Sequence, residues 1–257
     1  MGNRTRERNR LVMVGMLAAL GAALAWRPSP PAPVVCIDPG HPSEVSAGDS
    51  VINGITEAHA NWIVAEKLRE ELAQMGYVVC MTKQREDTLV RNRDRAEIAN
   101  RANAALLIRL HCDVGRDSGY AVYYPDRVGT AEGRTGPSDS VREMSRRAAQ
   151  KIHAAMADRL ARYLHDGGVL GDSKTFVGGK QGALTGSVFS QVPVVTVEMV
   201  VLSHKADAQF IASEAGSSQM QRGCRFILMR RKRKHIDLPS RSRRIMAVKP
   251  FLRSASH

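Results

Sequence analysis

The sequence lacks the short motifs that would identify a site on their own. Its four cysteines form no CxxC pair, which argues against a zinc site built from thiolates. No HExxH motif is present, and the glycine-rich stretch 167–186 lacks the GxxxxGK[ST] order of a phosphate-binding loop. There is no internal repeat. A site in this chain must therefore be assembled by the fold from residues far apart in the sequence.

The central part of the chain also lacks net positive charge, although the formal net charge of the whole chain is +13. Residues 1–10 hold four Arg and one Glu, and residues 222–257 hold twelve Lys or Arg and one Asp. These ends contribute +3 and +11, which leaves −1 for the residues between them. A domain that binds duplex nucleic acid needs a basic face on its folded body, so no nucleic-acid partner is expected.

An uncharged and mostly apolar run, residues 11–26, is slightly short for a membrane-spanning helix. It follows a basic segment and ends in small residues, a pattern typical of an export signal. Residues 1–26 are therefore predicted to be a signal peptide cleaved near Ala25, or a signal anchor that attaches the protein to the membrane. The expected location is the periplasm or cell envelope, with residues 27–33 as a Pro-rich linker.

Two further features follow from this organisation. The tail 222–257 has no apolar period and is expected to be basic and disordered, with binding to anionic wall polymers or lipid as the alternative. Cys36 and Cys80 both lie in predicted strands. An oxidising compartment would permit a bridge between them, but two small buried thiols are the favoured interpretation.

Residues 34–221 read as strands alternating with helices. Strands are predicted within 33–40, 77–82, 105–112, 119–125 and 192–200, and helices over 56–76, 88–104, 140–164 and from residue 203 onward. Loops are expected over 126–138 and 167–186. Several strands are continuous apolar runs, which indicates a single α/β domain with a mixed, mostly parallel sheet and helices on both faces.

Three chemically active side chains follow or close strands of this sheet. His41 follows the first strand, His111 ends the third and Glu198 lies in the last long strand. Glu57 stands at the start of the first helix. Because ligands of α/β sheets bind beyond the carboxyl ends of the strands, these four residues are expected to lie close together.

Two imidazoles and one carboxylate with an open fourth position are typical of a hydrolytic zinc site. The metal activates water, and a second, unligated carboxylate is then needed to move the proton. His41, Glu57 and His111 can supply the ligands, and Glu198 the second carboxylate.

Four segments carry a resemblance to a known family: "CIDPGH", the helix start at Glu57, "NRDRAEIANRANAALLIRLHCD" and "VPVVTVEM". In this order and spacing they resemble the zinc-dependent N-acetylmuramoyl-L-alanine amidases of the bacterial cell wall. The resemblance spans about residues 34–215 and implies a catalytic domain of the zinc-exopeptidase type. It implies Zn²⁺ ligands at His41, Glu57 and His111, and a catalytic Glu198. The implied reaction is hydrolysis of the peptidoglycan amide between the lactyl group of N-acetylmuramic acid and L-alanine of the stem peptide.

Other residues receive weaker predictions. Candidate substrate contacts are Arg109, Asp172, Ser173, Lys174 and His204. Arg109 is equally expected to form a salt bridge inside the fold or to bind an anionic carboxylate of the stem peptide. Asp38 and Asp113 are candidates for orienting a metal-binding imidazole through a hydrogen bond. The alternative for each is an ordinary position in a turn or on the surface. A regulatory protein is a candidate partner.

Two rival functions stay open on the sequence, besides a degenerate amidase that binds its substrate without cutting it. The first is a zinc carboxypeptidase or aminopeptidase of similar fold, which would need an arginine clamp or carboxylates for a second metal. The second is a non-catalytic wall-binding or nucleic-acid-binding protein that depends on the basic tail. That second function predicts that removing residues 222–257 abolishes function while Glu198→Gln has no effect.

Overall fold

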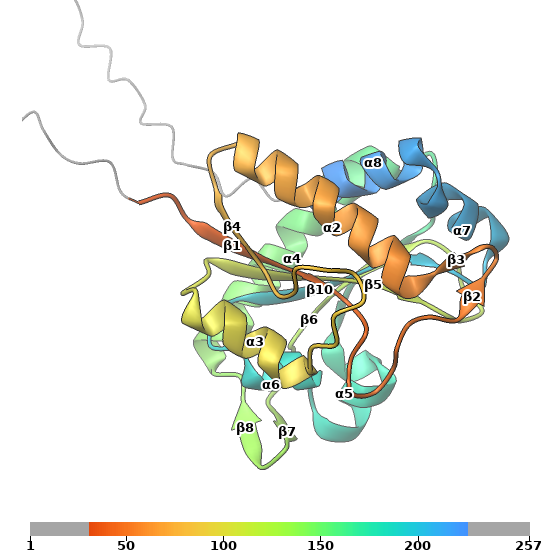
Figure 1. Cartoon of the computed structure of the whole chain (residues 1–257). Coiled ribbons are helices and arrows are strands. Elements are labelled where there is room, and N and C mark those ends of the chain that lie inside the picture. The colour runs from red at the N-terminus through yellow and green to blue at the C-terminus, as the bar shows by residue number, and fades with distance from the viewer. Residues whose placement is uncertain (1–30, 226–257) are drawn as a thin grey trace, which may run out of the picture. The chain divides into compact units, whose positions relative to one another are not determined.

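A six-stranded sheet organises the residues that the computed structural model describes, 31–225 (Figure 1). From one edge to the other the sheet holds β4 (Val78–Met81), β1 (Val34–Pro39), β5 (Leu106–Asp113), β10 (Val194–Val201), β6 (Tyr120–Tyr124) and β9 (Asp166–Gly171). The first four strands are parallel, while β6 is antiparallel to β10 and parallel to β9. The predicted mixed, mostly parallel sheet is confirmed.

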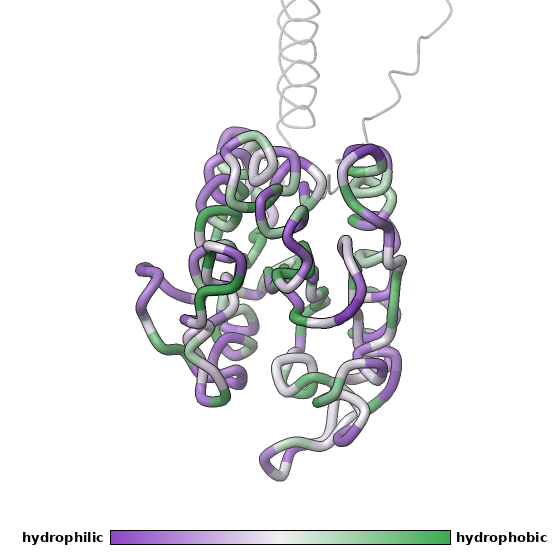
Figure 2. Tube along the Cα trace, turned by 90° about the vertical axis from the view of Figure 1, so that its right-hand side faces the viewer, coloured by the Kyte–Doolittle hydropathy of each residue, from purple (hydrophilic) through white to green (hydrophobic). Residues whose placement is uncertain are grey.

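The central strands form because their side chains are apolar on both faces of the sheet. Leu106, Leu107, Ile108 and Leu110 of β5 are all buried, and seven of the eight residues of β10 are buried. Continuous apolar runs of this kind fit strands covered by helices on both sides. Figure 2 shows hydrophilic residues concentrated along the outer edges of the trace.

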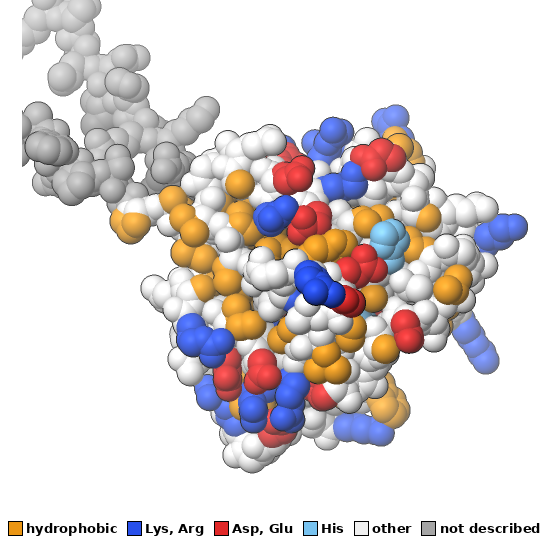
Figure 3. All heavy atoms as spheres, in the orientation of Figure 1, with side chains coloured by type: hydrophobic (Ala, Val, Ile, Leu, Met, Phe, Trp, Pro, Cys, Tyr) orange, Lys and Arg blue, Asp and Glu red, His pale blue; other side chains and the backbone are white. Residues whose placement is uncertain are grey.

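Helices cover both faces of the sheet, as predicted. One layer contains α2 (Glu57–Gln74), α4 (Asp139–Leu160), α7 (Lys205–Ala212) and α8 (Glu214–Cys224). The other contains α3 (Asn92–Arg101), α5 (Phe176–Gln181) and α6 (Thr185–Phe189). Figure 3 shows acidic and basic side chains gathered together over α3. Within this helix Arg93 pairs with Glu97, and it also pairs with Glu132.

The expected loops contain structure that the sequence pattern did not reveal. The stretch 126–138 holds a two-stranded hairpin, β7 (Gly129–Ala131) and β8 (Arg134–Gly136). The glycine-rich stretch 167–186 holds most of β9, the 3-10 turn η1 (Asp172–Lys174), α5 and the start of α6. A second small hairpin joins β2 (Val51–Ile52) to β3 (Ile55–Thr56). These elements are too short and too rich in glycine to show a period in the sequence.

Several predictions concern the ends of the chain. The signal or anchor segment 1–26, most of the linker and nearly all of the tail lie outside the described residues. The helix α8 runs to Cys224, past the domain boundary expected at 221. Within residues 31–225, no helix is both long enough and apolar enough to cross a membrane.

Cys36 and Cys80 are register partners on the neighbouring strands β1 and β4. Both thiols are free in the structure. Cys36 is fully buried, as expected of a small apolar side chain, whereas Cys80 is partly exposed at the edge strand.

Candidate active site

His41 follows β1 at a sharp Asp-Pro-Gly turn, and its backbone lies in the left-handed region with φ of +57°. The glycine of this turn is required by packing. A Cβ at Gly40 would come within 2.3 Å of Cε1 of His111, so only glycine lets the two histidines approach each other. The turn therefore brings the end of β1 directly against the end of β5.

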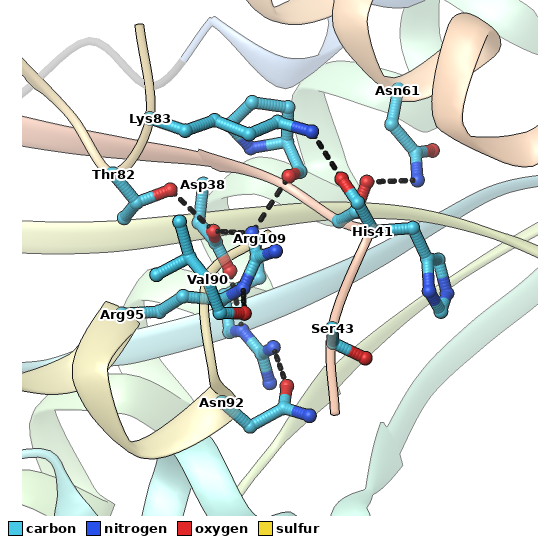
Figure 4. A network of polar contacts seen from close by, with 12 residues as sticks. Asp38, His41, Ser43, Asn61, Thr82, Lys83, Val90, Asn92, Arg95 and Arg109 are labelled. Carbon is cyan, nitrogen blue, oxygen red and sulfur yellow. Dashed lines mark hydrogen bonds and ion pairs between the residues drawn. The ribbon is translucent and has the colours of Figure 1, made fainter. Parts of the chain in front are cut away.

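Four consecutive carbonyl groups of this turn accept hydrogen bonds from side chains, as Figure 4 shows in part. Arg95 of α3 donates to the carbonyls of residues 39 and 42, at 2.8 and 2.7 Å. Asn61 of α2 donates to Gly40 at 3.2 Å, and Lys83 donates to His41. Because these donors come from three separate segments, the surrounding fold imposes the unusual conformation of the turn.

Asp38 anchors the same arginine from below the turn. Its Oδ1 accepts from Arg95 and Thr82, both at 2.5 Å, and its Oδ2 accepts from Nε of Arg109 at 2.8 Å. Burial opposes ionisation of Asp38, but the two guanidinium charges outweigh it and hold its pKa well below the usual range. The prediction that Asp38 orients an imidazole is wrong, because both of its oxygens are held by other groups. Figure 4 shows the His41 imidazole directed away from this network.

His41, Glu57 and His111 converge as predicted. Nε2 of His41 lies 3.2 Å from Oε2 of Glu57, and Nδ1 of His111 lies 3.1 Å from Oε1 of the same carboxylate. One ligand atom from each residue lies within 4.8 Å of the others. The two rings meet edge to face, with centroids 5.2 Å apart.

Local contacts hold His41 and Glu57 in place. Nδ1 of His41 lies 3.0 Å from the carbonyl oxygen of Ser46, and Nε2, the other ring nitrogen, faces Glu57. Glu57 opens α2, and its Oε1 accepts from the amide of Cys112 and from Asn61. The Ser46 carbonyl thus performs the orienting role that the sequence pattern predicted for an aspartate.

The electrostatics of the three groups are mutually dependent. Burial alone would raise the pKa of Glu57, but hydrogen bonds from His111 and His41 outweigh it and hold the pKa well below its usual range. Burial disfavours protonation of His41, yet contact with Glu57 raises its pKa. For His111 burial is the larger effect, and its pKa lies below the ordinary value. A carboxylate kept ionised beside one imidazole kept neutral is a donor set for a cation.

The separations fit a divalent metal of the zinc type. Two ligands at zinc–nitrogen and zinc–oxygen bond lengths on a tetrahedral ion lie roughly 3.3 Å apart. The observed separations of 3.2 and 3.1 Å across Glu57 are close to that value. Each imidazole faces a different oxygen of Glu57, and the three ligand atoms lie within 4.8 Å of one another, so the three residues could together hold the metal.

Glu198 lies beside this cluster on β10, in register with His111 of β5. Its Oε2 is buried and has no hydrogen-bond partner among residues 31–225. Burial raises the pKa of Glu198 well above its usual value, with the charges of Glu57 and Asp113 adding to the effect. A cation bound by the neighbouring cluster would favour the ionised form. An unpaired buried carboxyl group in this position fits a group that exchanges a proton with substrate or water.

A cavity of about 160 Å³ opens over these residues. Its lining includes three of the predicted residues at one end, His41, His111 and Glu198, and Arg109 further in. The rest of the lining consists of residues that no local sequence pattern distinguishes: Ser43, Val45, Asn92, Val177, Leu184, Thr185 and Thr196.

The other predicted substrate contacts lie elsewhere, and those predictions are not supported by the cavity. Ser173 binds Asp126 through both its amide and its hydroxyl group, and Lys174 is exposed outside the lining. His204 pairs with Asp207 at 2.8 Å. Asp113 is exposed and accepts from the amide of the next residue, so it orients no imidazole in the structure. His59 is exposed and paired with Glu86.

Asp172 is fully buried and accepts from the amide of Leu184, which ties the glycine-rich stretch to the cavity wall. Burial raises its pKa to about 6, against the opposing effects of that hydrogen bond and the charge of Arg109. The folded protein therefore binds this proton more tightly than the unfolded chain, in which an aspartate pKa is about 3.9. The resulting stability is complete below about pH 4 and is lost as pH rises through about 6.

Asp172→Asn removes this titrating group. Between pH 4 and pH 7 the free energy of unfolding of the variant should therefore fall less than that of the wild type, by roughly 3 kcal/mol at most. Urea unfolding of both proteins at the two pH values measures this difference, with the exposed Asp158→Asn as the control. An identical pH dependence in wild type and Asp172→Asn would contradict the assignment.

Comparisons with known proteins identify the family and support the fold. The sequence profile of the N-acetylmuramoyl-L-alanine amidase family matches residues 35–227, about three quarters of the chain. No curated protein matches the chain.

Solved structures agree in fold. The amidase AmiC2 of Nostoc punctiforme is 20% identical, with 75% of this chain and 92% of that chain covered and a TM-score of 0.60. The apo form of Ami1 from Mycobacterium abscessus is 23% identical, with 75% and 94% covered and a TM-score of 0.59. The CwlD amidase of Clostridioides difficile, in complex with the GerS lipoprotein, is 15% identical, with 75% and 94% covered and a TM-score of 0.58. With a profile match over most of the domain and this shared fold, the chain belongs to the N-acetylmuramoyl-L-alanine amidase family.

Proposed function

We propose that this amidase is a zinc enzyme, with Zn²⁺ held by His41, Glu57 and His111 and with Glu198 as its proton-transfer residue. It acts on peptidoglycan, on the amide between N-acetylmuramic acid and L-alanine. The observation that carries the proposal is the convergence of two imidazoles on one carboxylate, each at the separation that two ligands of a tetrahedral ion have. An unpaired carboxyl group stands directly beside them.

When bound, the metal supplies Lewis-acid polarisation of the scissile carbonyl and makes the attacking water more acidic. The residues of the chain do the rest. The rigid turn around residue 41 and the end of β5 fix the two imidazoles, so little reorganisation accompanies substrate binding. The cavity confines the amide beside Glu198, which limits access of bulk water.

Glu198 accepts a proton from the attacking water and returns it to the departing nitrogen of L-alanine. The ionised form takes up the first proton, and the protonated form delivers it, so one carboxyl group serves both steps. Its position in a rigid central strand, in register with His111, holds it close to the reacting atoms. The peptide product leaves with a neutral amine nitrogen rather than an unstable amide anion.

The proposal extends to location. Peptidoglycan lies outside the cytoplasmic membrane, so the basic and apolar segment 1–26 is proposed to direct export, as a cleaved signal or as an anchor. The CwlD structure contains a protein partner, and a regulatory protein that docks on the catalytic domain is a corresponding proposal for this chain.

Removing the metal is expected to abolish hydrolysis reversibly. The full chain is incubated with purified peptidoglycan, with and without a chelator, and mass spectrometry detects free stem peptides that begin with L-alanine. Their release should stop with the chelator and return when Zn²⁺ is added in excess. Release of peptides lacking L-alanine would support the zinc peptidase instead. Chelator-insensitive release would contradict the metal assignment.

A matched variant separates the site from the basic tail. His111→Ala should lose the metal and the activity, whereas a chain shortened after residue 225 should keep both. The opposite pattern, in which the shortened chain is inactive and His111→Ala is active, would favour a non-catalytic protein that acts through its tail.

A further inference from the structure

The cavity continues past the metal-site residues along two neighbouring strands. Arg109 and His111 are two residues apart on β5, so their side chains lie on the same face of the sheet. The same holds for Thr196 and Glu198 on β10. The register pairs Arg109 with Thr196 and His111 with Glu198. Two rows of side chains therefore cross the floor of the cavity, separated by two strand residues or about 6.6 Å. The first row carries the chemistry, and the second has no role in it.

The second row lies next to two arginines that share a single hydrogen-bonded carboxylate. Asp38 is shared by two guanidinium groups, Arg95 and Arg109, and all three side chains are at least 96% buried. One carboxylate cannot neutralise both cations. Arg95 directs its other donors to backbone carbonyls, which leaves Arg109 as the cation that reaches the cavity.

Arg109 retains donor capacity there. Its Nε binds Asp38 and its Nη2 binds the side-chain oxygen of Asn92 at 2.6 Å. Within the described part of the chain, Nη1 makes no hydrogen bond, and it lies against Gly186, where a Cβ would come within 2.8 Å of it. The backbone of α6 thus approaches the guanidinium group closely without covering it with a side chain.

Polar groups that lack partners surround this cation. Thr196 lines the cavity, is 3% exposed, and its hydroxyl group has no hydrogen-bond partner within residues 31–225. The charge of Arg109 acts on two carboxyl groups, that of Glu198 in the first row and that of Asp172 outside the lining. Neither carboxyl group is hydrogen-bonded to Arg109 in the described structure. A buried cation with an open donor beside an unpaired hydroxyl group is a site that an anion would complete.

We propose that Arg109 and Thr196, with Asn92 and Thr185 at the rim, form a subsite for a carboxylate of the stem peptide. This inference rests on the proposed function, because the first row must hold the scissile amide. In an extended peptide, a carboxylate on the residue after L-alanine lies about 7 Å from the scissile carbonyl, two residue lengths away. That distance matches the spacing of the two rows. The enzyme would therefore select stem peptides in which this carboxylate is free rather than amidated.

A pair of substrates tests the subsite: two muramyl dipeptides that differ only in whether the carboxylate of the residue after L-alanine is free or amidated. With the full-chain enzyme loaded with zinc, kcat/KM for the free acid should exceed that for the amide by at least about tenfold, because the amide presents a donor to Arg109. Equal values for the two substrates would overturn the subsite.

Thr196→Val provides the sharpest variant. Valine has the same shape, and the hydroxyl group it removes has no partner, so folding should be unaffected. We expect KM for the free acid to rise severalfold with kcat unchanged, and the amide to be unaffected. Thr130→Val, exposed on β7 outside the cavity, is the matched control. A Thr196→Val enzyme with unchanged KM for the free acid would contradict the role of this hydroxyl group.

Binding of the two product dipeptides, measured by calorimetry, separates this inference from the proposed function. If neither substrate is cleaved but the free-acid product still binds at least about tenfold more tightly than its amide, the function fails and the subsite stands. If both substrates are cleaved and both products bind equally, the function stands and the subsite fails.

Discussion

Glu198→Gln is expected to lower the rate of amide hydrolysis by about 10²–10⁴-fold and to leave zinc bound. Positioned acid–base groups contribute acceleration of this size, and glutamine can neither accept a proton from water nor donate one to the leaving nitrogen. Glutamine has nearly the same volume as glutamate. Since Oε2 of Glu198 has no partner in the described structure, the substitution breaks no network that holds the fold.

The measurement combines the rate on peptidoglycan with metal content and thermal unfolding of the same protein. Metal content and midpoint should match the wild type, and the rate alone should fall. Glu70→Gln, exposed on α2, is the matched control and should retain full activity. A rate for Glu198→Gln within tenfold of the wild type would show that another group transfers the proton.

Arg95→Met should be the most destabilising change near the site, at about 3–5 kcal/mol. It removes the ion pair to Asp38 and the bonds to the carbonyls of residues 39, 42 and 90, all within a buried environment. Because those bonds fix the turn on both sides of His41, zinc affinity should also fall by about 10–100-fold. Denaturant unfolding measures the first effect, and competition with a chelating dye measures the second.

Two variants define the cause. Arg93→Met, on the same helix but with exposed ion pairs, should cost less than about 1 kcal/mol and leave zinc affinity unchanged. Arg95→Lys restores a charge beside Asp38 but cannot bridge two carbonyls, so stability should recover more than zinc affinity does. Zinc binding by folded Arg95→Met within twofold of the wild type would refute the positioning role of Arg95.

The residues of the proposed metal site could be predicted because each stands at the end of a strong local pattern. His41 follows a buried strand and a sharp turn, His111 lies near the end of another buried strand, and Glu57 begins a helix capped by Thr56. A parallel sheet collects such ends at one edge. The helix start and the strand ends are therefore sufficient to predict that the three residues meet.

The supports of the site could not be predicted in the same way. Arg95, Lys83 and Asn61 bind the turn from segments 21 to 56 residues away, and no local pattern distinguishes a buried donor from an exposed one. Arg95 lies among arginines of which its neighbour Arg93 is exposed and paired on the surface. The direction of each side chain depends on tertiary packing, which a single sequence does not encode locally.

The cavity wall shows the same limit. The glycine-rich stretch contributes Val177, Leu184 and Thr185 to the lining, whereas its polar residues Asp172 and Ser173 are occupied by internal hydrogen bonds. The cavity does not support the prediction of these polar residues as substrate contacts, because Asp172 binds the amide of Leu184 at the start of α6 and Ser173 binds Asp126. Thr196 could not be singled out because it sits inside an apolar strand run.

The position of the bound metal is the strictest test of the zinc assignment. Crystals of the full chain grown with Zn²⁺ should give a single strong anomalous difference peak at the zinc edge. We expect the peak about 2.0–2.2 Å from Nε2 of His41, an Oε atom of Glu57 and Nδ1 of His111, with Glu198 outside bonding distance. A peak bound by Glu198, or none at these three residues in a protein shown to contain zinc, would contradict the metal assignment and the role of Glu198.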